Sequence, residues 1–129
     1  MDVNEKISYW LKISELDLPV MEHLYNSGDY HYSLYIGHLS LEKILKAHYV
    51  KKNSDSPPRS HDLLKLALSA GLNLTDEQQK FLLEVNHFNI EARYPDEKLS
   101  FYNSATKEYT TEKIIQIKEL HSWLKSLMQ

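Results

Sequence analysis

The stretch YHYSLYIGHLSLEKILKAHYVKK, from Tyr30 to Lys52, says most about the fold. Its apolar and aromatic residues recur at helical spacing and cover more than one side of the expected helix. A helix that is apolar on most sides lies at the centre of its domain, or contacts a second subunit as well as its own core. We therefore expect a central helix here. Gly37, which costs helix stability, marks a place where a neighbouring helix or aromatic ring packs closely.

The preceding segment predicts a second long helix, from Val3 to Asn26, with apolar residues near helical spacing. Pro19 should kink that helix or split it just before the proline. The turn NSGD then separates the two helices, with Gly28 as the stop residue and Asp29 as the next N-cap. These two long helices are expected to pack as an antiparallel hairpin.

A polar, proline-containing loop, NSDSPPRS at 53–60, follows the central helix. We then expect a short helix from His61 to Gly71. A further helix should open at the capping box TDEQ, with Thr75 as the N-cap, and stop at Pro95.

After this fourth helix, the polar residues 96–109 read as a loop, and a last helix should run from Thr110 or Thr111 to the end. The sequence therefore predicts an all-α, single-domain bundle of four to five helices over residues 1–129, with a long antiparallel N-terminal helix pair.

The composition agrees with a helical globular domain. The 129 residues are 42% hydrophobic and 26% charged, with only 3 glycines and 4 prolines. The absence of cysteine excludes disulfides and thiolate metal sites. The start MDVNEKISYW lacks the basic and apolar segments of a signal peptide, and no long apolar run suggests a membrane span. We expect a soluble, cytoplasmic protein without a membrane segment.

The net charge of −3, from 15 basic and 18 acidic residues, gives no support for binding nucleic acid by bulk phosphate attraction. The two arginines, Arg59 and Arg93, are few enough that each invites a specific explanation. Seven histidines occur, but no His-x-x-x-His or His-Glu-x-x-His pair. Because metal ligands cluster, we expect no metal site, and nothing in the sequence indicates a cofactor.

Two motifs have both a structural and a functional interpretation. Glu42 and Lys46 are spaced i, i+4, which suits a solvated charge pair on the edge of the central helix, but they could also border a cleft. In SHDLLKLA, His61 opens the third helix and Asp62 lies in its first turn. Capping explains this arrangement, and an anion site at the helix N-terminus is the functional alternative.

The third motif is EARYPD, which ends the fourth helix. Arg93 suits the negative end of a helix, and Pro95 ends it with Tyr94 already extended. Neither explanation accounts for Tyr94 and Asp96 beside the arginine. The presence of a tyrosine and an aspartate beside the arginine suggests a binding site.

In order along the chain, HYSLYIGHLSLEKILKAHYV, HDLLKLA and EARYPD resemble the HEPN domain family (higher eukaryotes and prokaryotes nucleotide-binding). The resemblance covers essentially the whole chain. It implies a bundle of four or five helices, commonly a homodimer, and a link to nucleotides or RNA. Members of this superfamily often accompany a minimal nucleotidyltransferase, frequently in toxin–antitoxin-like pairs.

Catalytic HEPN domains are metal-independent ribonucleases with the motif Arg-x(4–6)-His, which is absent here: Lys98, Leu99 and Ser100 follow Arg93 at that spacing. His61 follows Arg59 too closely, and His87 precedes Arg93.

Three interpretations therefore stand. The first is a non-catalytic, homodimeric module that binds a nucleotide or a nucleotide-bearing partner through Arg93, with Tyr94, Asp96, His61, Lys46 and Glu42 as further candidates. The second is an endoribonuclease using Arg93 with His61 or His87. The third is a structural helper that docks on a nucleotidyltransferase.

Overall fold

A computed structural model describes residues 1–128, without the side chains of Pro95 and Asp96. These residues form six α-helices and no strands: α1 Val3–Asn26, α2 Tyr30–Asn53, α3 Leu63–Ser69, α4 Asp76–Arg93, α5 Pro95–Ser104 and α6 Lys107–Ser126. None of the described helices is both long and apolar enough to cross a membrane. The all-helical bundle is thus confirmed, but the expected four to five helices are six.

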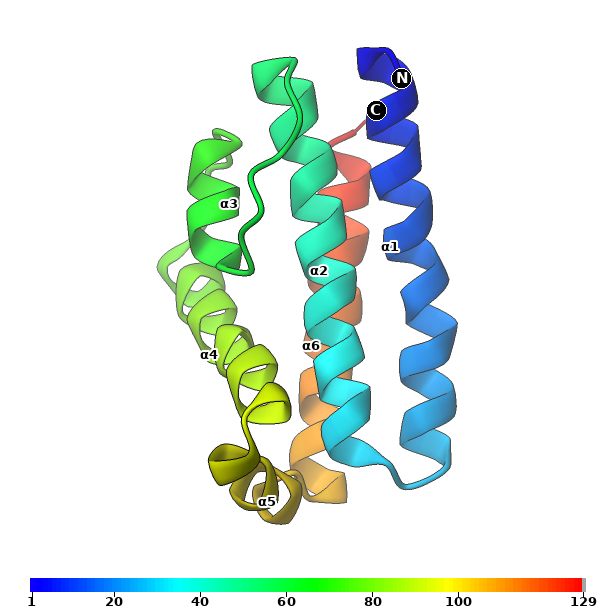
Figure 1. The fold of residues 1–129 in the computed structure, drawn as a ribbon, viewed down its shortest axis with the longest axis vertical. Coiled ribbons are helices and arrows are strands. Elements are labelled where there is room, and N and C mark those ends of the chain that lie inside the picture. Colours follow the sequence, from blue (N-terminus) through cyan, green and yellow to red (C-terminus); the bar gives the residue numbers. More distant parts are fainter. Residues whose placement is uncertain (129) are drawn as a thin grey trace.

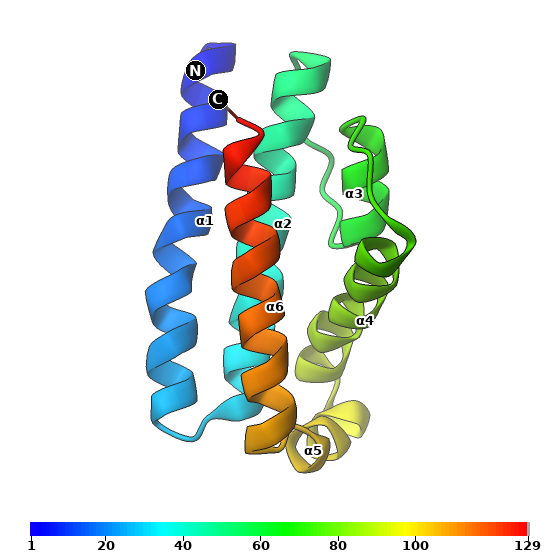
Figure 2. The same ribbon diagram turned by 180° about the vertical axis from the view of Figure 1, so that it is seen from behind.

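The long helices α1, α2 and α6 stand side by side, and α4 slants across the other side of α2 (Figure 1). The segment that joins α2 to α3 descends between α2 and α3 before α3 begins (Figure 1). The reverse view shows α6 between α1 and α4, with α5 at the end of the bundle where α1 turns into α2 (Figure 2). The predicted antiparallel pairing of α1 and α2 is present.

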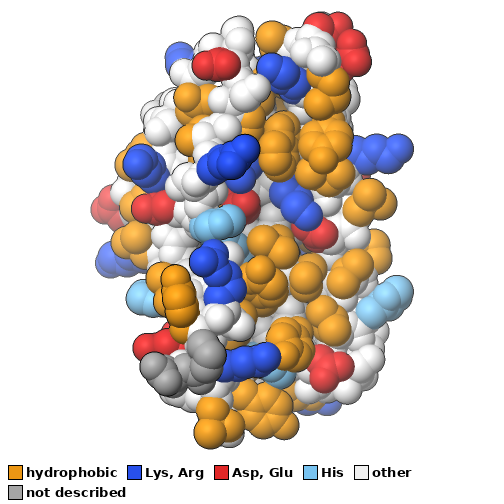
Figure 3. All heavy atoms as spheres, viewed as in Figure 1, with side chains coloured by type: hydrophobic (Ala, Val, Ile, Leu, Met, Phe, Trp, Pro, Cys, Tyr) orange, Lys and Arg blue, Asp and Glu red, His pale blue; other side chains and the backbone are white. Residues whose placement is uncertain are grey.

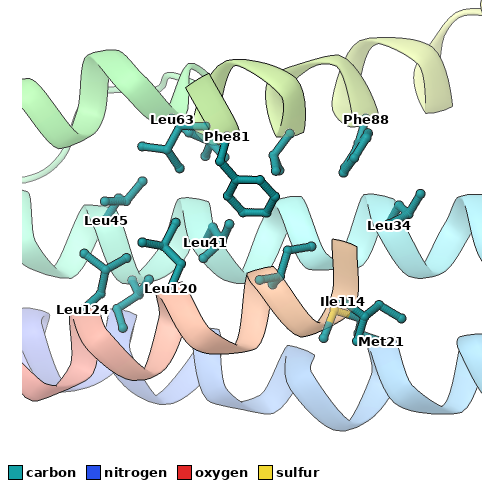
Figure 4. Packing of buried hydrophobic residues seen from close by; sticks show 14 of the residues in the cluster. Met21, Leu34, Leu41, Leu45, Leu63, Phe81, Phe88, Ile114, Leu120 and Leu124 are labelled. Carbon is teal, nitrogen blue, oxygen red and sulfur yellow. The ribbon is translucent and has the colours of Figure 1, made fainter. Parts of the chain in front are cut away.

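Helix α2 is the centre of the fold, because each of the other five helices packs against it. Side chains from α2, α4 and α6 meet in the main core, where Phe81 of α4 points toward the helices that carry Leu41 and Leu120 (Figure 4). The apolar excess of α2 is therefore covered by its own chain. A second subunit is not needed to explain it.

Two serine hydroxyls and a glycine bring α1 close to α2. Ser33 donates a hydrogen bond to the carbonyl of Met21 at 2.7 Å, and Ser40 donates to the carbonyl of Ser14 at 2.8 Å. A Cβ on Gly37 would lie 2.6 Å from Cδ1 of Ile117 in α6 and 3.1 Å from Sδ of Met21 in α1, so this glycine lets both helices approach α2. The close packing expected at Gly37 is confirmed.

Helix α1 runs through Pro19 as one continuous helix, so of the two outcomes expected there, a kink or a split, the split does not occur. The contact with α2 extends along the whole helix pair, and tertiary packing of this kind outweighs the local cost of one missing hydrogen bond.

The segment after α4 was predicted wrongly as a loop. Tyr94 is extended, as expected, at φ −103° and ψ 126°, but the next residue begins α5. Proline suits the first position of a helix, where its missing N–H has no partner to lose. Phe101 of α5 is only 2% exposed and stacks on Phe88 with ring centroids 5.7 Å apart, so burial of this aromatic ring anchors the helix.

The start of the last helix also differs from the prediction. The side chain of Thr106 accepts a hydrogen bond from the N–H of Tyr109 at 3.2 Å, which caps α6 at Lys107 rather than at Thr110 or Thr111. The capping box at Thr75 and Gln78 is confirmed. Gly71 adopts a positive φ of 72° just beyond α3, as a helix stop requires.

Candidate functional site

Glu42 lies at the centre of the candidate site. This carboxylate is 5% exposed and both of its oxygens are used. Oε2 accepts a hydrogen bond from Nζ of Lys46 at 3.0 Å, and Oε1 accepts one from Nδ1 of His61 at 2.8 Å. The pair between Glu42 and Lys46 is buried, so the interpretation as a solvated edge pair was wrong. The structure brings three of the predicted site residues into direct contact.

His38, one turn before Glu42, holds the segment that precedes α3. It is fully buried, and its Nε2–H donates to the carbonyl of His61 at 3.0 Å. Its Nδ1 lies 3.9 Å from Oε1 of Glu42 and has no hydrogen-bond partner in the described part of the chain. Burial lowers the pKa of His38 from 6.5 to about 4, and outweighs the opposite effect of Glu42. His38 is therefore neutral at physiological pH.

The start of α3 differs from the expectation, because Asp62 is the N-cap and His61 precedes the helix. The Asp62 carboxylate accepts the N–H of Lys65 at 3.2 Å and the side-chain amide of Asn86 at 3.0 Å. The carbonyl of that amide accepts the N–H of Leu63 at 2.8 Å. Two amides of this helix end are thus already bound, which argues against the proposed anion site there.

Arg93 lies at the C-terminal end of α4 and is exposed. Its Nη1 donates to Oδ1 of Asn89 at 3.1 Å, and its guanidinium carbon lies 5.7 Å from the ring centroid of Tyr94. Tyr94 is 51% exposed. Because Asn89 is a neutral partner, the positive charge of Arg93 is not neutralised by this contact. The side chain of Asp96 lies outside the described residues.

A pocket of about 200 Å³ lies between the start of α3 and the helix α4. It is lined by His61, Asp62, Asn86, Asn89 and Ile90. We call it the α3–α4 pocket. Asn89 is 3% exposed, and its Nδ2 has no hydrogen-bond partner among the described side chains. The pocket thus contains a histidine from the second motif and the hydrogen-bond partner of the arginine from the third. Figure 3 shows this face of the molecule, with histidine, acidic and basic side chains gathered near its middle.

The remaining candidates lie outside the α3–α4 pocket. Lys46 is on the far side of the Glu42 carboxylate, where its Nζ sits 5.3 Å from the ring centroid of Trp10 in α1. His87 is exposed and does not line the pocket, so of the two histidines considered with Arg93 only His61 lines it.

Asn86 and Asn89, which connect the motifs, were not predicted from the sequence. A signal for Asn89 was present, because it follows Leu82 and Val85 at i+7 and i+4 on the buried face of α4. A polar residue on such a face needs a hydrogen-bond partner, which here is Arg93.

The pocket and its surroundings combine acceptors with donors, and only the donors, on Arg93 and Asn89, can bind an anion. The Glu42 carboxylate can only accept, so the hydrogen on His61 lies on Nδ1 and leaves Nε2 as an acceptor in the neutral ring. Arg93 supplies a planar cationic donor, and Asn89 has a free amide hydrogen.

The profile of the HEPN domain matches residues 7–127. The chain belongs to the HEPN family. The HEPN chain also resembles the crystal structure of TT1696 from Thermus thermophilus, with a TM-score of 0.80 and 15% sequence identity, over 94% of this chain and 97% of that one. This likeness concerns the fold. No curated protein sequence matches the chain.

We expect Glu42→Gln to lower the free energy of unfolding by about 3 kcal/mol, because it removes the counter-charge of the buried Lys46 ammonium and leaves one acceptor oxygen where Lys46 and His61 now use two. Urea unfolding followed by circular dichroism measures this. Glu15→Gln, in an exposed pair with Lys125, is the control and should cost well under 1 kcal/mol. The double variant Glu42→Gln/Lys46→Met should recover part of the loss. A loss as small as that of the control would contradict a structural role for the buried pair.

The lowered pKa of His38 predicts acid destabilisation. Between pH 6.5 and about 4 the unfolded chain binds a proton at His38 that the folded chain does not, so stability falls as the pH is lowered through this window. The contribution reaches about 3 kcal/mol near pH 4. His38→Gln keeps a donor for the His61 carbonyl but does not titrate. Its unfolding free energy should fall less steeply than that of the wild type in the same urea series, and parallel pH profiles would refute the assignment.

Proposed function

We propose that this HEPN domain is a non-catalytic binding module whose α3–α4 pocket, with Arg93 at its side, takes a phosphate group of a nucleotide or of a nucleotide-bearing partner. One observation carries the proposal: Arg93 is hydrogen-bonded to Asn89, and Asn89 and His61 line the same pocket. A planar guanidinium with a neutral partner retains its charge for a phosphate, to which it can donate two parallel hydrogen bonds.

The exposed ring of Tyr94 next to Arg93 offers a stacking surface for a base. We further propose that the module works as a homodimer and as the accessory partner of a minimal nucleotidyltransferase in a toxin–antitoxin-like pair. Membership of the HEPN family supports this context. The exposed Arg93 and Tyr94 would then be the contact with the nucleotide that the partner carries.

Arg93→Ala is expected to weaken binding of ATP by at least about tenfold, because it removes a charge-assisted donor to phosphate. Isothermal titration calorimetry on the wild type, Arg93→Ala and Lys80→Ala measures this. Lys80 is an exposed lysine of the same helix, so its substitution changes the net charge equally.

The same variants serve in a pull-down from the native host, where a nucleotidyltransferase should be retained by the wild type and lost with Arg93→Ala. Arg93→Gln keeps a polar donor near Asn89 and separates loss of charge from loss of that contact. If Arg93→Ala and Lys80→Ala bind equally well in both assays, the proposal fails. Loss of folding together with binding would show that Arg93 is structural.

A metal-independent endoribonuclease is the second candidate, favoured by the hydrogen bond from His61 to Glu42. A carboxylate that orients a histidine in this way leaves Nε2 free to take the proton of a ribose 2′-hydroxyl as the adjacent phosphate is attacked. Arg93 would stabilise the charge that develops on the phosphate.

This activity predicts RNA cleavage that persists in EDTA and is lost in His61→Ala and in Arg93→Ala. His87→Ala is the matched control, because His87 is exposed and does not line the pocket. RNA that stays intact at a high ratio of protein to RNA would exclude the ribonuclease and leave the binding module.

A further inference from the structure

A second cleft lies on the other side of Glu42, between the first turns of α1 and the loop that joins α2 to α3. It has a volume of about 330 Å³. Its lining combines aromatic rings, prolines and cations: Met1, Lys6, Tyr9, Trp10, Lys46, Ser56, Pro57, Pro58 and Arg59. We call it the α1–loop cleft. No acidic side chain occurs in this lining as far as the chain is described, although the protein as a whole is acidic.

The cationic side chains of the cleft differ in whether an acidic side chain neutralises them. Lys46 is neutralised by Glu42. Lys6 donates to the neutral hydroxyl of Ser56 at 3.0 Å, and neither Lys6 nor Arg59 forms an ion pair with any described acidic side chain. Asp2 and Glu5 line a neighbouring depression that shares Met1 and Tyr9 with this cleft. Two uncompensated cations therefore border the α1–loop cleft.

Specific contacts hold the aromatic side chains of the cleft in place. The rings of Tyr9 and Trp10 lie edge to face, with centroids 5.5 Å apart, and Tyr9 is 47% exposed. Trp10 is held by the buried Lys46 ammonium, 5.3 Å from its ring centroid. The prolines at 57 and 58 add a stiff apolar wall with few conformations. Figure 3 shows hydrophobic side chains over the N-terminal part of α1, with Lys and Arg side chains among them.

We propose that the α1–loop cleft binds a nucleobase together with its phosphate. Aromatic side chains beside free cations match the two halves of a nucleotide, since a base stacks on a ring while its phosphate accepts from lysine and arginine. The volume suits a small ligand of this size. Trp10 and Tyr9 hold the base, and Lys6 and Arg59 hold the phosphate. This site is additional to the α3–α4 pocket and does not depend on a ligand there.

Trp10 itself can report binding, because the chain contains only one other tryptophan, Trp123 in α6. In a Trp123→Phe background we expect adenosine monophosphate and a short single-stranded oligoadenylate to change the Trp10 emission saturably, whereas inorganic phosphate at the same concentration does not. Arg59→Ala should weaken this binding by about tenfold, and Lys80→Ala should leave it unchanged. Arg59 is exposed, so its removal should not disturb folding.

Absence of a saturable response to both ligands would overturn the proposal, as would an affinity unchanged in the double variant Lys6→Ala/Arg59→Ala. Equal affinity for the monophosphate and the oligoadenylate identifies a free nucleotide, and much tighter binding of the oligoadenylate identifies a base within a strand. Arg93→Ala separates the two sites. It should leave the response to adenosine monophosphate intact, even if the function proposed for the α3–α4 pocket fails. A loss equal to that of Arg59→Ala would show that the α1–loop cleft is not a separate site.

Discussion

The site and much of the fold depend on the hydrogen bonds of one buried carboxylate, that of Glu42. A charge inside a helical core is costly unless it is paired and hydrogen-bonded, and here the partners come from two places. Lys46 lies one turn further along α2, but His61 belongs to the connection that leads to α3. Satisfying this carboxylate, together with the bond from His38 to the His61 carbonyl, fixes the path of that connection against α2. The positions of α3 and, through Asp62 and Asn86, of α4 follow from it.

How far the sequence predicts this structure depends on the strength of the local signals. Helices α1, α2 and α4 have long apolar patterns and clear caps, and their boundaries were predicted within a residue. Helix α5 was missed because Pro95 reads equally well as the end of one helix and the start of the next. Only the burial of Phe101 against Phe88 decides between these, and that contact belongs to the tertiary structure.

The candidate site shows the same division. The residues of the three motifs were recognised, and Glu42, Lys46 and His61 are in contact. The connections between the motifs were not recognised, because asparagines make them. Asparagine in a sequence usually indicates a turn or a helix cap. The histidine partner of Arg93 could not be chosen from spacing either. Residues far apart in sequence meet in a bundle, and it is His61 rather than the nearer His87 that shares a pocket with the arginine's partner.

Recognition of an anion by an acidic protein must come from local charge, and the pairing of individual cations decides where. Lys113 meets Glu84 and Lys43 meets Asp17, so these lysines contribute to packing and little to the outer field. Arg93 instead donates to the neutral Asn89, and Lys6 donates to the neutral Ser56. Lys6 lines the α1–loop cleft, and Arg93 is bonded to a residue that lines the α3–α4 pocket. The two oxygens of Glu42 bond to one lining residue of each, Lys46 and His61. A net charge of −3 is therefore compatible with binding phosphate, because the cations that matter are those without an acidic partner among the side chains that the structure describes.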